Sequence, residues 1–461
     1  MAADVPKDRR RVVIVGGGFG GLNVAKKLKS AAVQITVLDR RNHHLFQPLL
    51  YQVAAAALNP SDIAMPIRRI LRRQSNTEVL LGEATGIDTA RRVVQLEDGE
   101  VPYDYLIVAT GATHSYFGKD QWARFAPGLK TIEDALLIRR RVLLAYEMAE
   151  REQDPQIQRC WLNFLIVGAG PTGVELAGAL AEISRQTLEM DFRRIDPTSA
   201  RIVLLEGAPR VLPTYPEDLS EAAKRQLIKL GVEVRTHALV TAIDADGAVI
   251  GSERIPARTV IWAAGVAASP LARSLGVPLD RAGRVVVEPD LSVPGHPEIF
   301  VIGDLAAARS GGKPVPGIAP AAIQEGKHTA KNIIGELRGM ARVPFHYRDK
   351  GSIATIGRAA AVADLGRLKF TGFLAWLTWL VVHIFFLIGF RNRLLVLIEW
   401  AWSYLTTERG ARLITGLPSA EVEAEGLCAP TGVEPLGQAP APAPAGQVNA
   451  PNNPPLKSTS G

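Results

Sequence analysis

Two segments of the chain repeat one pattern of apolar and polar positions. The first, residues 11–40, runs from RVVIV through GGGFGG and LNVAKKLKS to VQITVLD. The second, residues 162–206, runs from LNFLIV through GAGPTG and VELAGALAEIS to RIVLLE. Short apolar runs predict buried strands, and the helical spacing between them predicts a crossover helix. The chain is therefore expected to contain an internally duplicated strand–turn–helix–strand unit.

Three more apolar runs accompany these units: DYLIVATGA between them, and TVIWAAGV and EIFVIGD after the second. Each ends in Gly or Asp, which is typical of sheet strands that bring backbone to a ligand. We expect an α/β fold with two Rossmann-like dinucleotide-binding domains, the second inserted in the first, plus a C-terminal membrane-binding helical region. The expected parts are 1–115 with 290–345 for the first domain, 116–289 for the second, 346–418 for the C-terminal region and 419–461 for a disordered Ala/Pro-rich tail.

The glycines of the first unit have the spacing of a phosphate-binding turn. Gly16 permits a tight turn, Gly18 lets the backbone approach a pyrophosphate, and Gly21 allows close packing of helix on strand. Asp39 ends the next strand, where a carboxylate accepts hydrogen bonds from ribose hydroxyls. Gly-rich turns also close ordinary hairpins, but the strand, helix and acidic residue in register favour a dinucleotide. Further candidates for cofactor binding are Arg40, Thr110, Gly111 and Gly265.

The second unit carries the same signature in Gly168, Gly170 and Gly173, with Glu206 at the end of RIVLLE. A glutamate at this position repels the 2′-phosphate of NADPH, so NADH is the predicted nucleotide. Arg210 lies four residues further on and could serve a phosphate instead.

Two such units in one chain predict two bound dinucleotides, FAD and NADH, arranged for hydride transfer from nicotinamide to flavin. The first unit is expected to take FAD, because the chain leaves the first domain, builds the second and returns through EIFVIGD. Asp304 ends that returning strand, where its carboxylate can bind flavin ribityl or pyrophosphate-linked groups. The alternative role for Asp304 is the N-cap of a following helix.

Residues 370–390 form an apolar run of 21 residues without Asp, Glu, Lys or Arg. The following RNRLLVLIEWAWSYL mixes aromatic and charged residues in the manner of an interfacial helix. Positive residues flank the run on both sides, so charge gives no orientation. We favour a segment bound to one face of the membrane over a true span. A buried helix at a homodimer interface is the remaining alternative.

Charge and cysteine content narrow the classes of function. The net charge of +7 and pI near 9.4 suit nucleic acid, an anionic membrane surface or anionic substrates, and no nucleic-acid motif is present. Cys160 and Cys428 lack the spacing of metal ligands or of a disulfide framework, so no metal site is expected. The basic N-terminus lacks a signal-peptide pattern, and the catalytic part is expected on the cytoplasmic face of the cell membrane.

Taken together, these motifs resemble the type II NADH:quinone oxidoreductases, single-chain NADH dehydrogenases that do not pump protons. The resemblance extends to about residue 416 and rests on RRNHHLFQPLLYQVA, VATGA, VGAGPTGVELAGAL, FVIGDLA, PGIAPAAIQEGKH and DKGSIATIGR. It implies FAD, NADH as electron donor, a quinone as acceptor and a lipid bilayer surface as partner. Disulfide reductases and sulfide:quinone reductases need cysteines that are absent from HHLFQPLLYQ, so electrons are not expected to leave through a dithiol.

The same resemblance points to quinone-site residues. In that family an AQxAxQ segment lines the quinone site, and the matching stretch here begins at Ala319, has Pro320 in place of the first glutamine and ends at Gln324. The alternative is that the stretch is just a helix start packed against FAD, and the two roles are compatible. Glu175 is expected to relay protons to the quinone, its plainer role being to complement the helix dipole. Lys350 and His43 are weaker candidates, and His383 is expected to have a packing role.

Two other hypotheses about the function stay open. A redox-sensing or scaffold flavoprotein resembling apoptosis-inducing factors would bind FAD and NADH but turn over slowly. A ferredoxin-type reductase would pass electrons to a soluble protein and would not need the C-terminal region.

Overall fold

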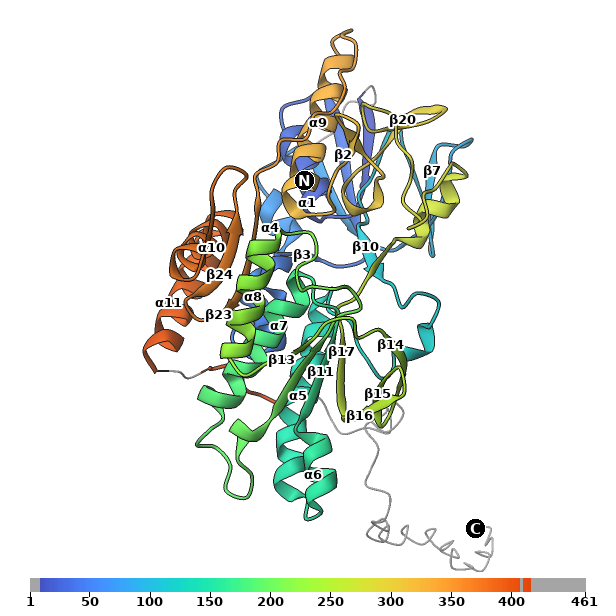
Figure 1. Ribbon diagram of the computed structural model, residues 1–461. Helices are drawn as coiled ribbons and strands as arrows, with labels where there is room; N and C mark the ends of the chain where they lie inside the picture. The colour runs from blue at the N-terminus through green and yellow to red at the C-terminus, as the bar shows by residue number, and fades with distance from the viewer. Residues whose placement is uncertain (1–8, 407–408, 416–461) are drawn as a thin grey trace, which may run out of the picture. The chain divides into compact units, whose positions relative to one another are not determined.

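The computed structural model describes residues 9–406 and 409–415, and it contains the predicted duplication (Figure 1). The predicted tail, 419–461, lies outside the described residues. In each unit the two strands are parallel neighbours and the helix connects them, as a right-handed crossover requires. The first unit consists of β1 (Arg10–Val15), α1 (Phe19–Lys27) and β2 (Val33–Asp39), and the second of β11 (Asn163–Val167), α7 (Pro171–Glu182) and β12 (Arg201–Leu205).

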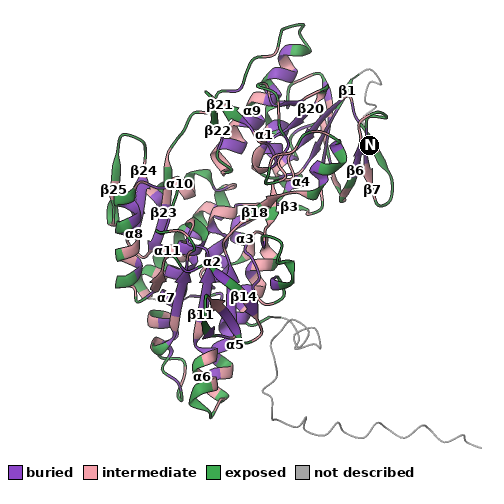
Figure 2. Cartoon of the chain, turned by 45° about the vertical axis from the view of Figure 1, so that its right-hand side comes forward, coloured by how far each residue is buried: buried purple, intermediate pink, exposed green. Residues whose placement is uncertain are grey.

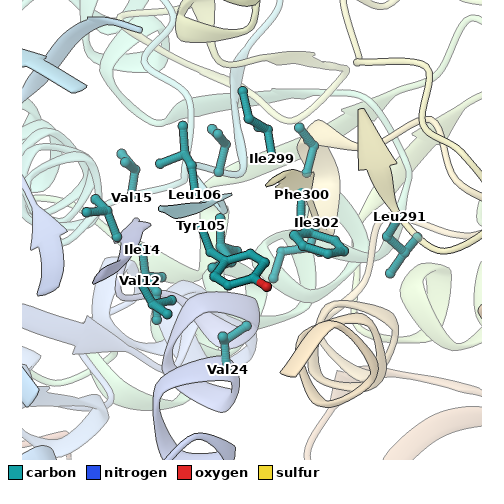
Figure 3. Packing of buried hydrophobic residues seen from close by; sticks show 14 of the residues in the cluster. Val12, Ile14, Val15, Val24, Tyr105, Leu106, Leu291, Ile299, Phe300 and Ile302 are labelled. Atoms are coloured by element: carbon teal, nitrogen blue, oxygen red, sulfur yellow. The ribbon is translucent and has the colours of Figure 1, made fainter. Parts of the chain in front are cut away.

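The first unit belongs to a sheet with the strand order β19-β20-β9-β1-β2-β5. Its late strand β20 pairs in parallel with β9, so the chain returns to this sheet after building the second one, as EIFVIGD predicted. The added strands are β5 (Thr77–Leu81), β9 (Tyr105–Val108), β19 (Ser292–Val293) and β20 (His296–Val301). Their apolar side chains form a continuous core, part of which Figure 3 shows around Ile14, Leu106 and Phe300.

The second unit belongs to a sheet with the order β13-β12-β11-β17, and parallel pairing joins all of its neighbours. Burial is concentrated in the strands of both sheets (Figure 2), because helices cover parallel sheets on their faces. The remaining elements of this part are α5 (Ile132–Arg151), α6 (Pro155–Trp161), α8 (Glu217–Lys229), β13 (Glu233–Arg235) and β17 (Thr259–Trp262).

Helix α9 (Ala319–Glu336) packs on α1 beside the first sheet. A side chain at Gly326 would place its Cβ 2.4 Å from the Gly20 carbonyl oxygen, so only glycine permits this approach of the two helices. Smaller elements are α2 (Leu50–Ala54), α3 (Pro60–Ile63), β4 (Ala64–Pro66) and two antiparallel sheets: β6 (Ala84–Asp88), β7 (Val93–Leu96) and β8 (Glu100–Pro102), and β14 (Val240–Asp244), β15 (Gly247–Ile250) and β16 (Glu253–Pro256).

The C-terminal region begins with an antiparallel sheet of β23 (Ser352–Gly357), β24 (Ala360–Asp364) and β25 (Lys369–Thr371). Two helices follow, α10 (Phe373–Phe386) and α11 (Phe390–Thr406), which lie beside β23 and β24 in Figure 1. The structure thus divides the apolar run 370–390 among a strand, a helix of 14 residues and a turn. At 1.5 Å per residue α10 is about 21 Å long, shorter than the roughly 30 Å hydrocarbon core of a bilayer.

Backbone chemistry explains where α10 begins and ends. Gly372, the residue before the helix, has a positive φ of 75°. Gly389, three residues after its last residue, has a positive φ of 93°. Arg393 donates hydrogen bonds to the carbonyl oxygens of Leu387 and Phe385, which have no helical partner at the C-terminal end. Among residues 9–406 and 409–415, no helix combines the length and apolarity that crossing a membrane requires.

Candidate functional site

The three glycines of the first predicted phosphate cradle differ in the space that a Cβ atom would have. Gly16 has φ of 107°, and a Cβ there would lie 2.4 Å from the Ala109 carbonyl oxygen. A Cβ on Gly21 would lie 1.9 Å from the Gly16 carbonyl oxygen. Around Gly18, by contrast, no described atom lies within 4 Å of the Cβ position. Gly16 and Gly21 are thus required by packing, and Gly18 faces open space where a pyrophosphate can approach.

The second cradle repeats this geometry at its three glycines. Gly168 has φ of 100° and a Cβ there would meet Ala264 Cα at 2.5 Å, while one on Gly173 would lie 1.9 Å from the Gly168 carbonyl oxygen. Gly170, like Gly18, has open space at its Cβ position. The N-termini of α1 and α7 follow these turns directly, so each cradle presents a positive helix end to an anion.

The two carboxylates predicted to bind ribose, Asp39 and Glu206, make matching hydrogen bonds within the protein. Asp39 accepts the Gly17 N–H at 2.6 Å and the Arg41 N–H at 2.7 Å, one on each oxygen. Glu206 accepts the Ala169 N–H at 2.7 Å and the Ala208 N–H at 2.8 Å in the same way. A carboxylate has about four lone-pair sites, so each can still accept ribose hydroxyls.

Three other predicted positions surround the first cradle. The Thr110 hydroxyl is buried without a hydrogen-bond partner in the described part of the chain, which fits a group that awaits a ligand. Gly111 has φ of 68° with open space at its Cβ position. Asp304 lies inside a 3₁₀ turn, Gly303–Leu305, and not at its N-cap, so the capping alternative is wrong. Its carboxylate lies 4.0 Å from the Lys130 ammonium. These residues fit a bound FAD.

Three more candidate positions have partners within the protein. The Arg40 guanidinium is exposed and pairs with Glu83 at 3.2 Å. A Cβ on Gly265 would lie 2.7 Å from the Phe117 ring, so packing also explains that glycine. Arg210 donates to the Pro213 carbonyl oxygen at 3.1 Å.

The stretch from Ala319 to Gln324 forms the first turns of α9, with Pro320 at a position that tolerates the missing N–H. Gln324 makes two hydrogen bonds to the Arg348 backbone, donating to its carbonyl oxygen at 3.0 Å and accepting its N–H at 3.0 Å. The side chain therefore joins α9 to the segment that leads into the C-terminal region.

Glu325, the next residue of α9, was not predicted from the sequence. Its side chain is 2% exposed and accepts the N–H of Gly303, the residue before Asp304. Burial raises the pKa of Glu325 to about 7, opposed by the Gly303 hydrogen bond and reinforced by the Asp304 charge. Glu325 thereby fixes the turn that carries Asp304. No sequence motif distinguishes it from an ordinary helical glutamate.

Glu175 lines a cavity of about 90 Å³ between α2, α7 and the C-terminal region. Burial raises the pKa of Glu175 well above its usual range, opposed by a hydrogen bond with the Thr355 backbone. Trp400 Nε1 donates to Gln52 at 2.7 Å, and Gln52 donates to the Tyr51 hydroxyl at 2.9 Å. The lining residues are Tyr51, Gln52, Ala57, Glu175, Ala179, Glu182, Thr355, Gly357, Arg358, Trp376, Trp379, Trp400, Ser403, Tyr404 and Arg409.

The cavity does not bring together Glu175 and Gln324, the two side chains predicted to act on the quinone. Glu175 lines it, whereas Gln324 does not and bonds Arg348 instead. The aromatic walls from α10 and α11 were missed, because the sequence gives no sign of where a C-terminal helix docks. Glu182 could have been found, since it follows Glu175 by two helical turns and so shares its face.

The weaker candidates have local partners. His43 Nδ1 lies 3.1 Å from Asn42 Oδ1, and burial lowers the pKa of His43. Lys350 lies over the Phe386 ring at 5.9 Å. His383 bonds the Trp379 carbonyl oxygen at 2.7 Å and stacks on that indole, in agreement with its expected packing role. Among the described residues no cluster of His, Cys, Asp and Glu could hold a metal ion.

Comparison with known proteins assigns the chain to a family. Residues 10–326 match the pyridine nucleotide-disulphide oxidoreductase family, and residues 350–408 match the NDH2 C-terminal domain. The type II NADH:quinone oxidoreductase Ndh of Mycobacterium tuberculosis is 50% identical over 89% of this chain and 91% of its own length. The type II NADH:quinone oxidoreductase of Staphylococcus haemolyticus is 31% identical over 79% and 92%.

A solved structure shows the same fold. NDH2 from Plasmodium falciparum in complex with NADH superimposes with a TM-score of 0.81 at 21% identity, covering 88% of this chain and all of that one. The family matches span both dinucleotide-binding units and the C-terminal region, and the identity with the mycobacterial enzyme extends over most of both chains. The chain belongs to the type II NADH:quinone oxidoreductases, within the pyridine nucleotide-disulphide oxidoreductase family.

Proposed function

We propose that this protein transfers electrons from NADH through FAD to a quinone at a membrane surface, without pumping protons. The observation that carries the proposal is the pair of equivalent dinucleotide cradles in one chain, beside a cavity that is lined by Glu175 and walled by C-terminal aromatic residues. The names of the mycobacterial and staphylococcal relatives support the same activity. The boundaries 1–115 with 290–345, 116–289 and 346–418 are our proposal for the three functional parts.

The chain's own residues have distinct tasks in this reaction. The first cradle, with Asp39 and Asp304, holds FAD, and the second, with Glu206, holds NADH and disfavours a 2′-phosphate. FAD, when bound, accepts hydride from the nicotinamide and passes on two electrons. Burial raises the pKa of Glu175, which favours the protonated carboxyl that can donate a proton to a reduced quinone. Gln324 positions the segment around Arg348 and stays a candidate for quinone binding, together with Ala319 and Pro320.

We also propose that α10 and α11 bind the bilayer from its cytoplasmic face. Both helices expose large apolar side chains. Moving one such side chain fully out of water is favourable by about 2 kcal/mol, so an apolar environment such as a bilayer stabilises this surface. This α10–α11 apolar surface comprises Phe373, Leu374, Leu377, Val381, Phe385, Phe390, Leu394, Leu397 and Leu405. A second copy of the chain covering this surface is the alternative occupant.

The activity test is NADH oxidation by the FAD-loaded protein on vesicles that contain a long-tailed quinone. Rapid turnover is expected, whereas a scaffold protein would accumulate a reduced complex that quinone does not reoxidise. A soluble electron-transfer protein that outcompetes the quinone would indicate a ferredoxin-type reductase instead. Sizing of the purified protein in detergent separates a monomer from a homodimer.

A further inference from the structure

Quinone reduction by NADH needs one proton from solvent. Hydride carries two electrons and one proton, and a quinone takes up two electrons and two protons to become a quinol. Each turnover therefore consumes NADH, quinone and one proton, and yields NAD⁺ and quinol. If Glu175 gives a proton to the quinone, as proposed above, it must be reprotonated from water. Its carboxyl lies among aromatic walls, so that proton needs a route.

A second, larger space lies close to the Glu175 cavity. This groove has a volume of about 890 Å³ and runs between α5, the segment after α7, α11 and residues 409–414. Glu147 and Asp191, on its walls, are exposed to solvent, so the groove is open to water. Four carboxylates line it: Glu147, Glu150, Asp191 and Glu399.

Arg409 separates the two spaces, because it lines both of them. Its guanidinium is buried and donates to Glu182 at 2.9 Å and to the Ala55 carbonyl oxygen at 2.8 Å. Glu182 is the carboxylate on the cavity side, 8% exposed, and its second oxygen accepts the N–H of Arg358. A buried ion pair thus stands at the boundary between the solvent groove and the Glu175 cavity.

Glu182 and Glu175 can be joined by water. Both side chains come from α7 and line the same cavity, and seven residues of helix separate them by about 10 Å. One water needs roughly 10–15 Å³ of such a cavity, so a cavity of about 90 Å³ has room for several waters. Neighbouring waters at ordinary hydrogen-bond lengths of about 2.8 Å can form a chain through it.

We propose that Glu182, held by Arg409, relays protons from the solvent groove through the cavity waters to Glu175. Arg409 stays charged and sets the position of the Glu182 carboxylate, and Glu182 acts on the quinone only through Glu175. The charged or titratable groups that face Glu182 are Arg358 from the β23–β24 turn, Arg409 after α11, Tyr51 from α2 and Tyr404 from α11.

Two electron acceptors separate proton delivery from electron delivery. Ferricyanide takes electrons without protons, whereas a quinone needs both. In Glu182→Gln, NADH-dependent ferricyanide reduction should stay close to that of the unaltered protein. Quinone turnover should fall on the order of 100-fold, the lower end of what a positioned proton donor contributes. The loss should grow from about pH 6 to about pH 9 as protons become scarce, and a solvent deuterium isotope effect on quinone turnover should appear or increase.

Three variants distinguish a proton relay from a structural ion pair. Glu182→Gln leaves Arg409 buried without its counter-ion, a strongly destabilising defect that can prevent folding. The double change Glu182→Gln with Arg409→Gln removes both charges and is expected to fold while keeping the quinone defect. Glu182→Asp keeps an ionisable carboxyl and should restore turnover. Glu189→Gln, at an exposed residue outside both spaces, is the matched control and should change nothing.

The proposal is overturned if the double variant reduces quinone as fast as the unaltered protein, or if ferricyanide and quinone turnover fall together without a change in pH profile or isotope effect. An unaltered protein that reduces ferricyanide but no quinone would overturn the proposed function and this relay with it. Normal quinone turnover in the unaltered protein and in Glu182→Gln alike would overturn the relay alone.

Discussion

Replacing Glu325 by glutamine should make the stability of the protein less sensitive to alkaline pH. Glu325 is 2% exposed, and burial raises its pKa from the ordinary 4.5 to about 7. The glutamine keeps an oxygen that can accept the Gly303 N–H, so the substitution removes the ionisation and preserves the contact. The effect should therefore appear as a pH dependence more than as a constant loss.

The sign and size follow from linkage. Below about pH 4.5 the carboxyl is protonated in the folded and unfolded states alike, and Glu325 retains its full stabilising contribution. As pH rises to about 7 the unfolded chain ionises first, and the folded state loses stability relative to it. Because one pKa unit is worth about 1.4 kcal/mol, the full loss is about 3.5 kcal/mol, of which about 2.5 kcal/mol falls between about pH 5 and about pH 8.

The assay is urea unfolding, followed by circular dichroism, with FAD removed so that only the chain's own groups contribute. Between about pH 5 and about pH 8, Glu325→Gln should gain about 2.5 kcal/mol relative to the unaltered protein. The control is Glu97→Gln, at an exposed position, which should show no such gain. Parallel stability curves for the unaltered protein and Glu325→Gln would refute the assignment of a raised pKa to this buried carboxyl.

Three further substitutions test the proposed function. Glu206→Gln should narrow a large preference for NADH over NADPH in kcat/KM, and equal use of both nucleotides by the unaltered protein would contradict the second cradle's assignment. Gln324→Ala should raise the quinone KM and leave NADH-dependent flavin reduction unchanged in stopped flow; equal slowing of both would make it a flavin-site residue. Phe385→Ser with Phe390→Ser, whose side chains are 67% and 82% exposed, should weaken vesicle binding in a flotation assay, whereas Leu81→Ser, 64% exposed, should not. Unchanged flotation would assign the α10–α11 apolar surface to another partner.

Point substitutions are a sharper test of the membrane proposal than removal of residues from Phe370 onward. Truncation should release the protein from membranes and impair the reduction of long-tailed quinones more than of soluble ones. The structure shows that the same truncation removes Trp376, Trp379 and Trp400 from the walls of the Glu175 cavity. A loss of activity after truncation could then come from lost membrane binding or from a damaged cavity. Surface substitutions change only membrane binding.

The duplicated units could be predicted because their determinants are local. Each unit consists of a glycine turn, Gly16–Gly21 or Gly168–Gly173, then a helix and a strand with an acidic residue at its end. All of these parts of one unit fit within about 40 residues of sequence. The return of the chain to the first sheet was also predictable, from the apolar strand before Asp304. These features depend on periodicity and backbone conformation, which short sequence segments encode.

The rest of the site depends on contacts between distant segments. Gln324 bonds the backbone of Arg348, and Glu325 owes its raised pKa to its burial between α9 and the turn that carries Asp304. The Glu182–Arg409 pair joins residues that are 227 positions apart. No local pattern shows that an arginine near the C-terminus will be buried against α7, and for that reason the cavity walls could not be predicted.

The attachment of the C-terminal region has a consequence for the order of folding. Asn392 donates hydrogen bonds to the carbonyl oxygens of Ser61 and Asp62, and Arg409 donates to that of Ala55, across 331, 330 and 354 residues. Contacts of such high sequence separation form late, because closing the intervening chain costs entropy before any contact is gained. During synthesis both dinucleotide-binding units emerge from the ribosome before α10 and α11. These apolar helices are therefore made after both units and find a completed docking site, which limits the time for which their apolar side chains can aggregate.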